Sequence, residues 1–193
     1  MPDRRRTFDD LFLNDADPWG FESKPYEKAK RAATVEAIAV PPPAHILEIG
    51  CANGVLTADL IARGYRVTAI DISAHALTLA RARLPNRVEA RLIQGEVPYD
   101  WPRGIYDLVL ISEVLYFLTA DEIAEVSRAS WGSLLPGSEC LLVNWTGPND
   151  LPVDGNRAAD LFERAMPWAA SMRQTEDLYR IDRLYKSPTG PDR

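Results

Sequence analysis

The chain lacks a long apolar run, which argues against a membrane-spanning segment. The longest such run, "LVLISEVLYFL" at residues 108–118, carries Glu113 in its middle, and a spanning helix takes about 20 apolar residues. The arginines at 4–6 are followed by acidic residues where an export leader would need an apolar segment. The sequence therefore predicts a cytoplasmic protein that has no membrane partner.

Positive charge and cysteine are also in short supply. The chain has 22 Lys and Arg against 28 Asp and Glu, a formal net charge of −6. Nucleic acids favour a basic surface, so the sequence predicts no nucleic-acid partner. The two cysteines, Cys51 and Cys140, lie inside apolar segments and fit no metal-ligand spacing. We therefore expect reduced, buried thiols and no metal site.

Predicted strands and helices alternate regularly along the 193 residues, and this length fits one domain. A helix is predicted at 26–39, and the prolines at 41–43 end it. Alternating strands and helices are typical of a parallel sheet covered on both faces. Towards the end a helix is followed by "PWAASMRQ" and "EDLYRIDRLYKS". The second segment alternates as an edge or antiparallel strand does, and the first could pair with it as a hairpin. The predicted strands are 45–50, 65–71, 87–95, 105–112, 136–145, 167–174 and 176–187, and the other helices are 54–64, 74–84, 119–135 and 156–165.

The turn after the first predicted strand, "HILEIGCANG" at 45–54, raises the question of a ligand. Its spacing is not that of the dinucleotide fingerprint, because Ala52 fills the middle glycine position. It is not a phosphate-binding P-loop either, because no Lys follows Gly54. Glycine at 50 and 54 permits close approach of a ligand, but also a tight turn with close helix packing. The turn alone leaves both interpretations open.

Polar residues at the ends of the predicted strands favour the ligand. Asp71 ends the second strand, 21 residues after Gly50, and Glu96 follows the third. Glu48 lies near the end of the first strand, and Ser112 and Glu113 end the fourth. In open parallel sheets ligands bind beyond the carboxyl ends, with a ribose-binding acid at about that distance from the glycines. One such acid is often merely solvated, but four groups at one edge predict a nucleoside ligand.

Several stretches, taken as a set, carry a family resemblance. "ILEIGCANG", "AID", "QGE", "YDLVLISEVLYFL" and "LLPGSECLL" resemble the motif series of class I S-adenosylmethionine-dependent methyltransferases, over roughly residues 44–145. "DPWGFESKPYEKAKRAATVEAI" and "EVLYFL" are similar to the nodulation protein S (NodS) group, which N-methylates amino sugars of chitooligosaccharide type.

The resemblance implies a fold and a division of the chain. The fold is a single-domain, Rossmann-like α/β fold with a mostly parallel seven-stranded sheet, helices on both faces and an antiparallel C-terminal strand or hairpin. Residues 1–43 would form an N-terminal lid segment and helix. Residues 44–193 would form the core that binds S-adenosylmethionine, with a loop for the methyl acceptor at 145–156.

Cofactor-binding roles also follow from the resemblance. Glu48 would orient the ammonium group of the cofactor, Asp71 would accept the ribose hydroxyls, and Glu96 with the Val97 N–H would bind the adenine edge. Trp19 could equally be a staple onto the core. The cofactor-binding residues implied are Trp19, Tyr26, Lys30, Arg31, Glu48, Gly50, Cys51, Gly54, Asp71, Ile72, Glu96, Val97 and Ser112.

Catalysis on an amine would require a group that takes its proton, because the nitrogen must be neutral when it attacks. The candidates are Glu113, Tyr116 and Asp150. The predicted function is methylation of a small molecule, with an amino sugar or related amine as the acceptor and S-adenosylhomocysteine as the product. The alternatives are an O-methyltransferase, a regulatory domain that binds the cofactor without turnover, and a nicotinamide-dependent oxidoreductase, which Ala52 disfavours. The acceptor and the oligomeric state stay open.

Overall fold

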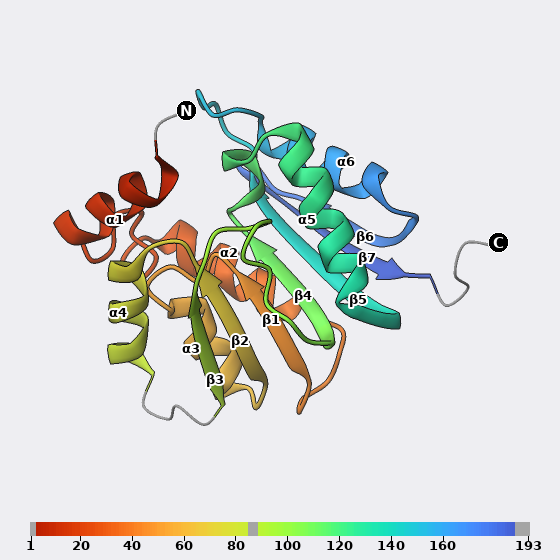
Figure 1. The fold of residues 1–193 in the computed structure, drawn as a ribbon, viewed down its shortest axis with the longest axis horizontal. Helices are drawn as coiled ribbons and strands as arrows, with labels where there is room; N and C mark the ends of the chain where they lie inside the picture. Colours follow the sequence, from red (N-terminus) through yellow and green to blue (C-terminus); the bar gives the residue numbers. More distant parts are fainter. Residues whose placement is uncertain (1–2, 85–88, 188–193) are drawn as a thin grey trace.

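The computed structural model describes residues 3–84 and 89–187, which contain a seven-stranded sheet in the order β3-β2-β1-β4-β5-β7-β6 (Figure 1). β1 to β5 run parallel, and β7 is antiparallel to both β5 and β6. The predicted fold class, including the C-terminal hairpin, is confirmed. The strands are β1 (His45–Ile49), β2 (Arg66–Asp71), β3 (Ala90–Gln94), β4 (Tyr106–Ser112), β5 (Leu134–Trp145), β6 (Trp168–Thr175) and β7 (Tyr179–Lys186).

Helices cover both faces of the sheet. On one face α2, α3 and α4 pack against β1 and β4 through residues such as Leu60 and Leu77, and on the other α5 and α6 do so through Ile123 and Phe162. None of the helices in the described residues is long and apolar enough to cross a membrane. The helices are α1 (Arg4–Asn14), α2 (Pro25–Glu36), α3 (Val55–Ala62), α4 (Ala74–Arg83), α5 (Ala120–Gly132) and α6 (Gly155–Ala165), with a 3₁₀ turn η1 (Leu115–Phe117).

Local sequence sets the start of the helix that follows β4. Thr119 is the N-cap of α5, as predicted, and its side chain accepts a hydrogen bond from the Glu122 N–H at 3.3 Å. The Glu122 carboxylate accepts from the Thr119 N–H in return, at 2.8 Å. This reciprocal capping box satisfies two donors that a helix start would otherwise leave without partners.

The carboxyl ends of the central strands are level. Ile49 pairs with Ile70 on one side and with Ile111 on the other, so β1, β2 and β4 end at one edge of the sheet. This register brings Glu48, Asp71 and Ser112, which are far apart in sequence, to one place.

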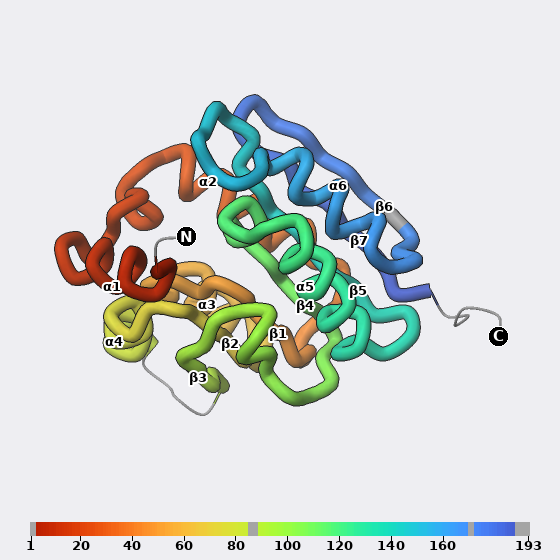
Figure 2. The backbone as a smooth tube through the Cα atoms, turned by 45° about the horizontal axis from the view of Figure 1, so that its top comes forward, coloured from red at the N-terminus to blue at the C-terminus, as the bar shows by residue number. Residues whose placement is uncertain are grey.

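One helix was not predicted. α1 begins at Arg4 with Asp3 as its N-cap and lies beside α4 in both Figure 1 and Figure 2. Ser73, the N-cap of α4, donates its hydroxyl to the Asp9 carboxylate at 2.7 Å. This hydrogen bond and contacts at Arg4 hold α1 against the edge of the sheet where β1, β2 and β4 end.

Candidate active site

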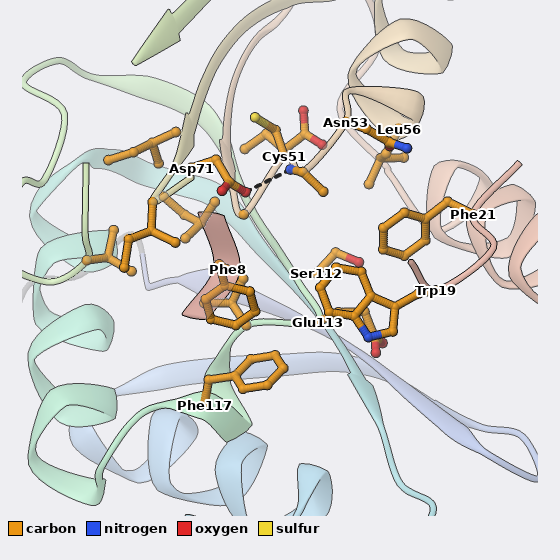
Figure 3. A pocket seen from close by; sticks show the side chains of 18 of the residues that line it. Phe8, Trp19, Phe21, Cys51, Asn53, Leu56, Asp71, Ser112, Glu113 and Phe117 are labelled. Carbon is orange, nitrogen blue, oxygen red and sulfur yellow. Dashed lines mark hydrogen bonds between the residues drawn. The ribbon is translucent and has the colours of Figure 1, made fainter. Parts of the chain in front are cut away.

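A cavity lies beyond the carboxyl ends of β1, β2 and β4, and the N-terminal segment forms one of its walls (Figure 3). Most of the predicted site residues line it, but Tyr26, Gly54 and Asp150 do not. The predicted residues that line the cavity are Trp19, Lys30, Arg31, Glu48, Gly50, Cys51, Asp71, Ile72, Glu96, Val97, Ser112, Glu113 and Tyr116. Those that the sequence interpretation missed include Arg4, Phe8, Phe12, Phe21, Glu27, Asn53 and Phe117.

The turn after β1 needs its glycines for reasons of its own. Gly50 and Gly54 both have φ of +77°, a conformation that costs little only for glycine. A Cβ at Gly50 would collide with Cγ2 of Val114, and one at Gly54 would lie 2.8 Å from the Cβ of Ala80 on α4. Close packing of the chain on itself therefore explains these glycines, and the backbone of Gly50 borders the cavity as well.

Asp71 is placed to receive hydroxyl donors. One carboxylate oxygen accepts from the Ala52 N–H at 2.8 Å and the other from the Ser73 N–H at 2.9 Å (Figure 3). Burial raises the pKa of Asp71 to about 6, against the lowering effect of these two bonds. Each oxygen keeps a further lone pair, so the side chain can still accept a pair of ribose hydroxyls.

The ribose role of Asp71 predicts a loss of cofactor affinity on substitution. Asp71→Ala should weaken binding of S-adenosylhomocysteine by on the order of 2 kcal/mol, about 30-fold, because two charge-assisted hydrogen bonds are lost. Titration calorimetry measures this. Asp71→Asn, which keeps the shape and one acceptor oxygen, is the matched variant and should lose less. An unchanged affinity in Asp71→Ala would show that this carboxylate does not hold the ribose.

Glu48 is a buried acid at the end of β1 that lines the cavity. It is 1% exposed, and it accepts a hydrogen bond from the Thr57 hydroxyl at 2.6 Å. Burial is the main cause that raises its pKa to about 7, and the nearby Asp71 carboxylate adds to it. A positive group that enters the cavity would favour the ionised form. This fits the predicted role in orienting an ammonium group.

Glu96, which the resemblance assigns to the adenine edge, already holds a cation. The Nε of Arg4 donates to Glu96 Oε1 at 2.9 Å, and the same guanidinium bonds the Glu122 carboxylate and the Phe117 carbonyl. The bond to Arg4 is the main cause that lowers the pKa of Glu122 to about 2. Arg4 thus joins α1 to the loop after β3 and to the start of α5.

Aromatic rings from the N-terminal segment form the wall opposite the strand ends. Trp19 lies 5.5 Å from Phe12 and 5.6 Å from Phe21, measured between ring centroids. Phe8 meets Phe117 edge-on at 5.0 Å (Figure 3). Trp19 therefore packs against other rings and also lines the cavity, and its predicted contact with the cofactor stays a prediction.

The position of this wall predicts a change in mobility on cofactor binding. If residues 15–31 close over the cofactor, their amides should exchange hydrogen faster without S-adenosylhomocysteine than with it. We expect the same of α1, which the Arg4 and Asp9 contacts join to the edge of the sheet. Hydrogen exchange followed by mass spectrometry tests this, with β5 as the internal reference. Equal protection in both states would make Trp19 a core staple only.

The basic pair on α2 is engaged by acids. Lys30 is 5% exposed, and its Nζ lies 3.0 Å from Glu27 and 3.4 Å from Glu113. Arg31 bonds Asp59 at 2.6 Å and the carbonyl of Phe21 at 2.7 Å. Both side chains therefore already have partners within the protein. Their predicted contact with the cofactor stays a prediction.

Tyr26 stands behind Lys30 rather than in the cavity. The Lys30 ammonium lies 5.1 Å from the centre of the Tyr26 ring, and Tyr179 packs against the same ring at 6.1 Å. A ring face attracts a cation, so Tyr26 supports Lys30. Its predicted contact with the cofactor stays a prediction.

Glu113 is the most constrained acid of the site. Its backbone has φ of +62°, which is uncommon outside glycine, and its N–H donates to the Val143 carbonyl at 2.8 Å. The Tyr116 hydroxyl donates to Glu113 Oε2 at 2.5 Å. Burial raises the pKa of the Glu113 carboxyl, while Lys30 and Tyr116 lower it. A carboxylate that lines the cavity therefore lies beside Ser112 at the end of β4, and its predicted role as a base stays a prediction.

The loop after β5 does not bring its acids to the cavity. Asp150 is exposed and Asp154 is the N-cap of α6, where it accepts from the Arg157 N–H at 2.9 Å. Asn149 bonds its own loop, at the Gly147 carbonyl and the Leu151 N–H. The catalytic role of Asp150 stays a prediction, with Glu113 and Tyr116 better placed.

The groups present fit S-adenosylmethionine. A carboxylate at the end of β2 suits the ribose, and buried Glu48 suits the ammonium group. Within the described residues, the side-chain oxygen of Asn53 is buried, has no hydrogen-bond partner and belongs to a residue that lines the cavity. An acceptor left in this way calls for a ligand or a water molecule as its donor.

Comparison with known proteins agrees with this fit. Residues 46–137 match the family described as methyltransferase domain. Nodulation protein S of Rhizobium tropici is 32% identical over 120 residues, which are 62% of this chain and 49% of that protein. An uncharacterized methyltransferase of Mycobacterium tuberculosis is 33% identical over 122 residues, 61% of this chain and 48% of that one. The chain spans about half the length of these curated relatives.

A solved structure supports the fold. The N-methyltransferase NodS from Bradyrhizobium japonicum, in complex with S-adenosyl-L-homocysteine, superposes with a TM-score of 0.78 at 20% identity. The match covers 94% of this chain and 97% of that chain. The chain therefore has the fold of the class I S-adenosylmethionine-dependent methyltransferases, and it is similar in sequence to the methyltransferase domain family and to nodulation protein S.

Proposed function

We propose that the protein transfers a methyl group from S-adenosylmethionine to the nitrogen of a small amine, such as an amino sugar. The observation that carries this is the acidic cluster of Glu27, Lys30 and Glu113 at the end of β4. Two carboxylates, Glu27 and Glu113, share one ammonium, that of Lys30, and all three side chains line the cavity. The cluster therefore has a net negative charge, which attracts an ammonium group and disfavours a carboxylate acceptor.

The residues of the chain would prepare the acceptor. S-adenosylmethionine, when bound, supplies a methyl group that is already activated for displacement. The Glu113 carboxylate takes a proton from the acceptor ammonium, which leaves a neutral amine whose lone pair attacks the methyl carbon. The carbon–sulfur bond breaks and its electron pair stays on sulfur. The methylated nitrogen then sheds a proton to solvent, and so does Glu113.

Exclusion of water supports the same chemistry. The cavity that Glu113 lines has aromatic rings in its walls, with Trp19 and Phe117 among them (Figure 3). Alignment and desolvation can supply most of the rate when the methyl donor is already activated. A ring-shaped acceptor also gains contact area from such walls, which is compatible with a sugar.

An acceptor panel tests the proposal. Release of S-adenosylhomocysteine should be measured with amino sugars, simple amines, and hydroxyl analogues of the same shape. We expect turnover with amines and a rate that rises with pH through the pKa of the acceptor ammonium, because only the neutral amine attacks. Methylation confined to the hydroxyl analogues would favour an O-methyltransferase. Cofactor binding without turnover on any acceptor would favour a regulatory domain.

A further inference from the structure

We infer that Lys30, held in place by Glu27, is a positioning residue that keeps Glu113 ionised and aimed at the acceptor. This inference rests on the proposed function, in which Glu113 takes the proton. The three side chains come from α2 and from the end of β4, and all three line the cavity. The role differs from the one that the resemblance implies for Lys30, which is contact with the cofactor.

The two oxygens of Glu113 have different surroundings. Oε2 accepts the hydrogen bond of Tyr116 at 2.5 Å. Oε1 is buried and has no hydrogen-bond partner among the described residues, and the Lys30 ammonium is 3.4 Å from it. This oxygen is therefore held by charge and remains able to accept a proton. Without Lys30, the Glu113 carboxylate would keep the hydrogen bond of Tyr116 but lose the positive charge that offsets the desolvation of Oε1.

Glu27 determines where the Lys30 ammonium lies. Glu27 and Lys30 are three positions apart on α2, and Nζ lies 3.0 Å from Glu27 Oε2. Tyr26 supports the same ammonium from its other side through its ring face. The long lysine side chain has many rotamers, and these two contacts on its own helix restrict them. The ammonium is thereby presented to Glu113 instead of to solvent.

Three groups act on the charge state of Glu113, and they come from two elements. From α2, Lys30 favours the ionised carboxylate and Glu27 disfavours it. From η1, the Tyr116 hydroxyl donates to it and favours ionisation. The Tyr26 hydroxyl is buried on the α2 side, and its pKa is raised by burial first and by Glu113 second. Removing Lys30 should therefore make Glu113 take a proton at a higher pH than in the wild type.

The decisive experiment compares the pH–rate profiles of two charge-changing variants with that of the wild type. In Lys30→Met the acidic limb should move up by about one pH unit or more, since an opposite charge at this distance typically shifts a carboxyl by one to three. In Glu27→Gln it should move down, because a like charge is lost. Lys30→Arg should restore the wild-type limb. Lys28→Met, an exposed position on the same helix, is the matched control and should leave the profile unchanged.

A second measurement does not depend on turnover. Infrared spectroscopy of the protein can follow the carboxyl C=O band of Glu113 with pH, with Glu113→Gln identifying the band. This band should appear at a higher pH in Lys30→Met than in the wild type, and at a lower pH in Glu27→Gln. If no acceptor is methylated, the proposed function fails while this titration still decides the role of Lys30.

The inference is overturned if the Glu113 band titrates alike in the wild type and both variants. It is also overturned if Lys30→Met weakens binding of S-adenosylhomocysteine at least tenfold without moving either titration, because Lys30 would then contact the cofactor. Should Lys30→Met fail to fold, Glu27→Gln still tests the inference because it keeps the lysine. In that variant the Glu113 titration should move in the opposite direction, to lower pH.

Discussion

Gly50→Val is expected to reduce binding of S-adenosylhomocysteine more than 100-fold and to lower the free energy of unfolding by about 3 kcal/mol or more. Two costs add at this position. The backbone φ of +77° is a genuine outlier for a β-branched residue, and its Cβ would collide with Val114. The turn must move to relieve the collision, and the same turn borders the cavity. Calorimetry and urea unfolding measure the two losses.

Gly137→Val separates strain from collision. Gly137 has φ of +86°, close to that of Gly50, but a Cβ there would meet nothing within 4 Å. This variant should lose stability without loss of cofactor affinity. In Gly50→Val, the additional change Val114→Ala should recover part of the lost affinity, because it removes the atom in the way. Wild-type affinity in Gly50→Val would mean that the turn does not shape the cofactor site.

The central sheet could be predicted because its signals are local. Strands β2 and β4 are largely apolar runs that end in a polar residue, Asp71 in β2 and Ser112 in β4. Parallel strands that end level must bring those residues together, so register alone converts sequence positions into a site. The antiparallel hairpin of β6 and β7 could also be predicted, because apolar and polar residues alternate in the segment of β7.

The wall of the cavity could not be predicted because its signals are not local. In α1, Phe8, Leu11 and Phe12 have helical spacing, but charged residues surround them. Much of what holds this helix is tertiary, since Arg4 bonds Glu96 and Glu122, which lie 92 and 118 positions away. From the sequence, the arginines at 4–6 were considered only as part of an export leader. No ion pair between them and distant acids was predicted.

The cluster of Glu27, Lys30 and Glu113 could be predicted only in part. Glu113 was singled out from its place at the end of β4, but Glu27 was missed. Its spacing of three from Lys30 is a common helix-surface pair, and nothing local marks the pair as buried. Asp150 was singled out because it lies in the loop after β5; it does not line the cavity, and its catalytic role stays a prediction.

Glu113→Gln is expected to lower kcat by about 100-fold or more, the usual range for loss of a general base, while the affinity for S-adenosylhomocysteine changes by less than about threefold. Glutamine keeps the shape and can still accept from Tyr116, but it cannot take a proton. It also leaves the Lys30 ammonium with Glu27 as its remaining carboxylate. Steady-state rates and calorimetry on the same preparations provide the comparison.

Tyr116→Phe is the matched control for this effect. It removes the hydrogen bond at Glu113 Oε2 but keeps the carboxylate, so its kcat should fall less than in Glu113→Gln. The pH dependence gives a further distinction. With the base absent, the pH–rate profile of Glu113→Gln should lose the limb set by Glu113 and keep only the rise through the pKa of the acceptor ammonium, which the wild type also shows. A glutamine variant as active as the wild type would assign the proton to another group or to water.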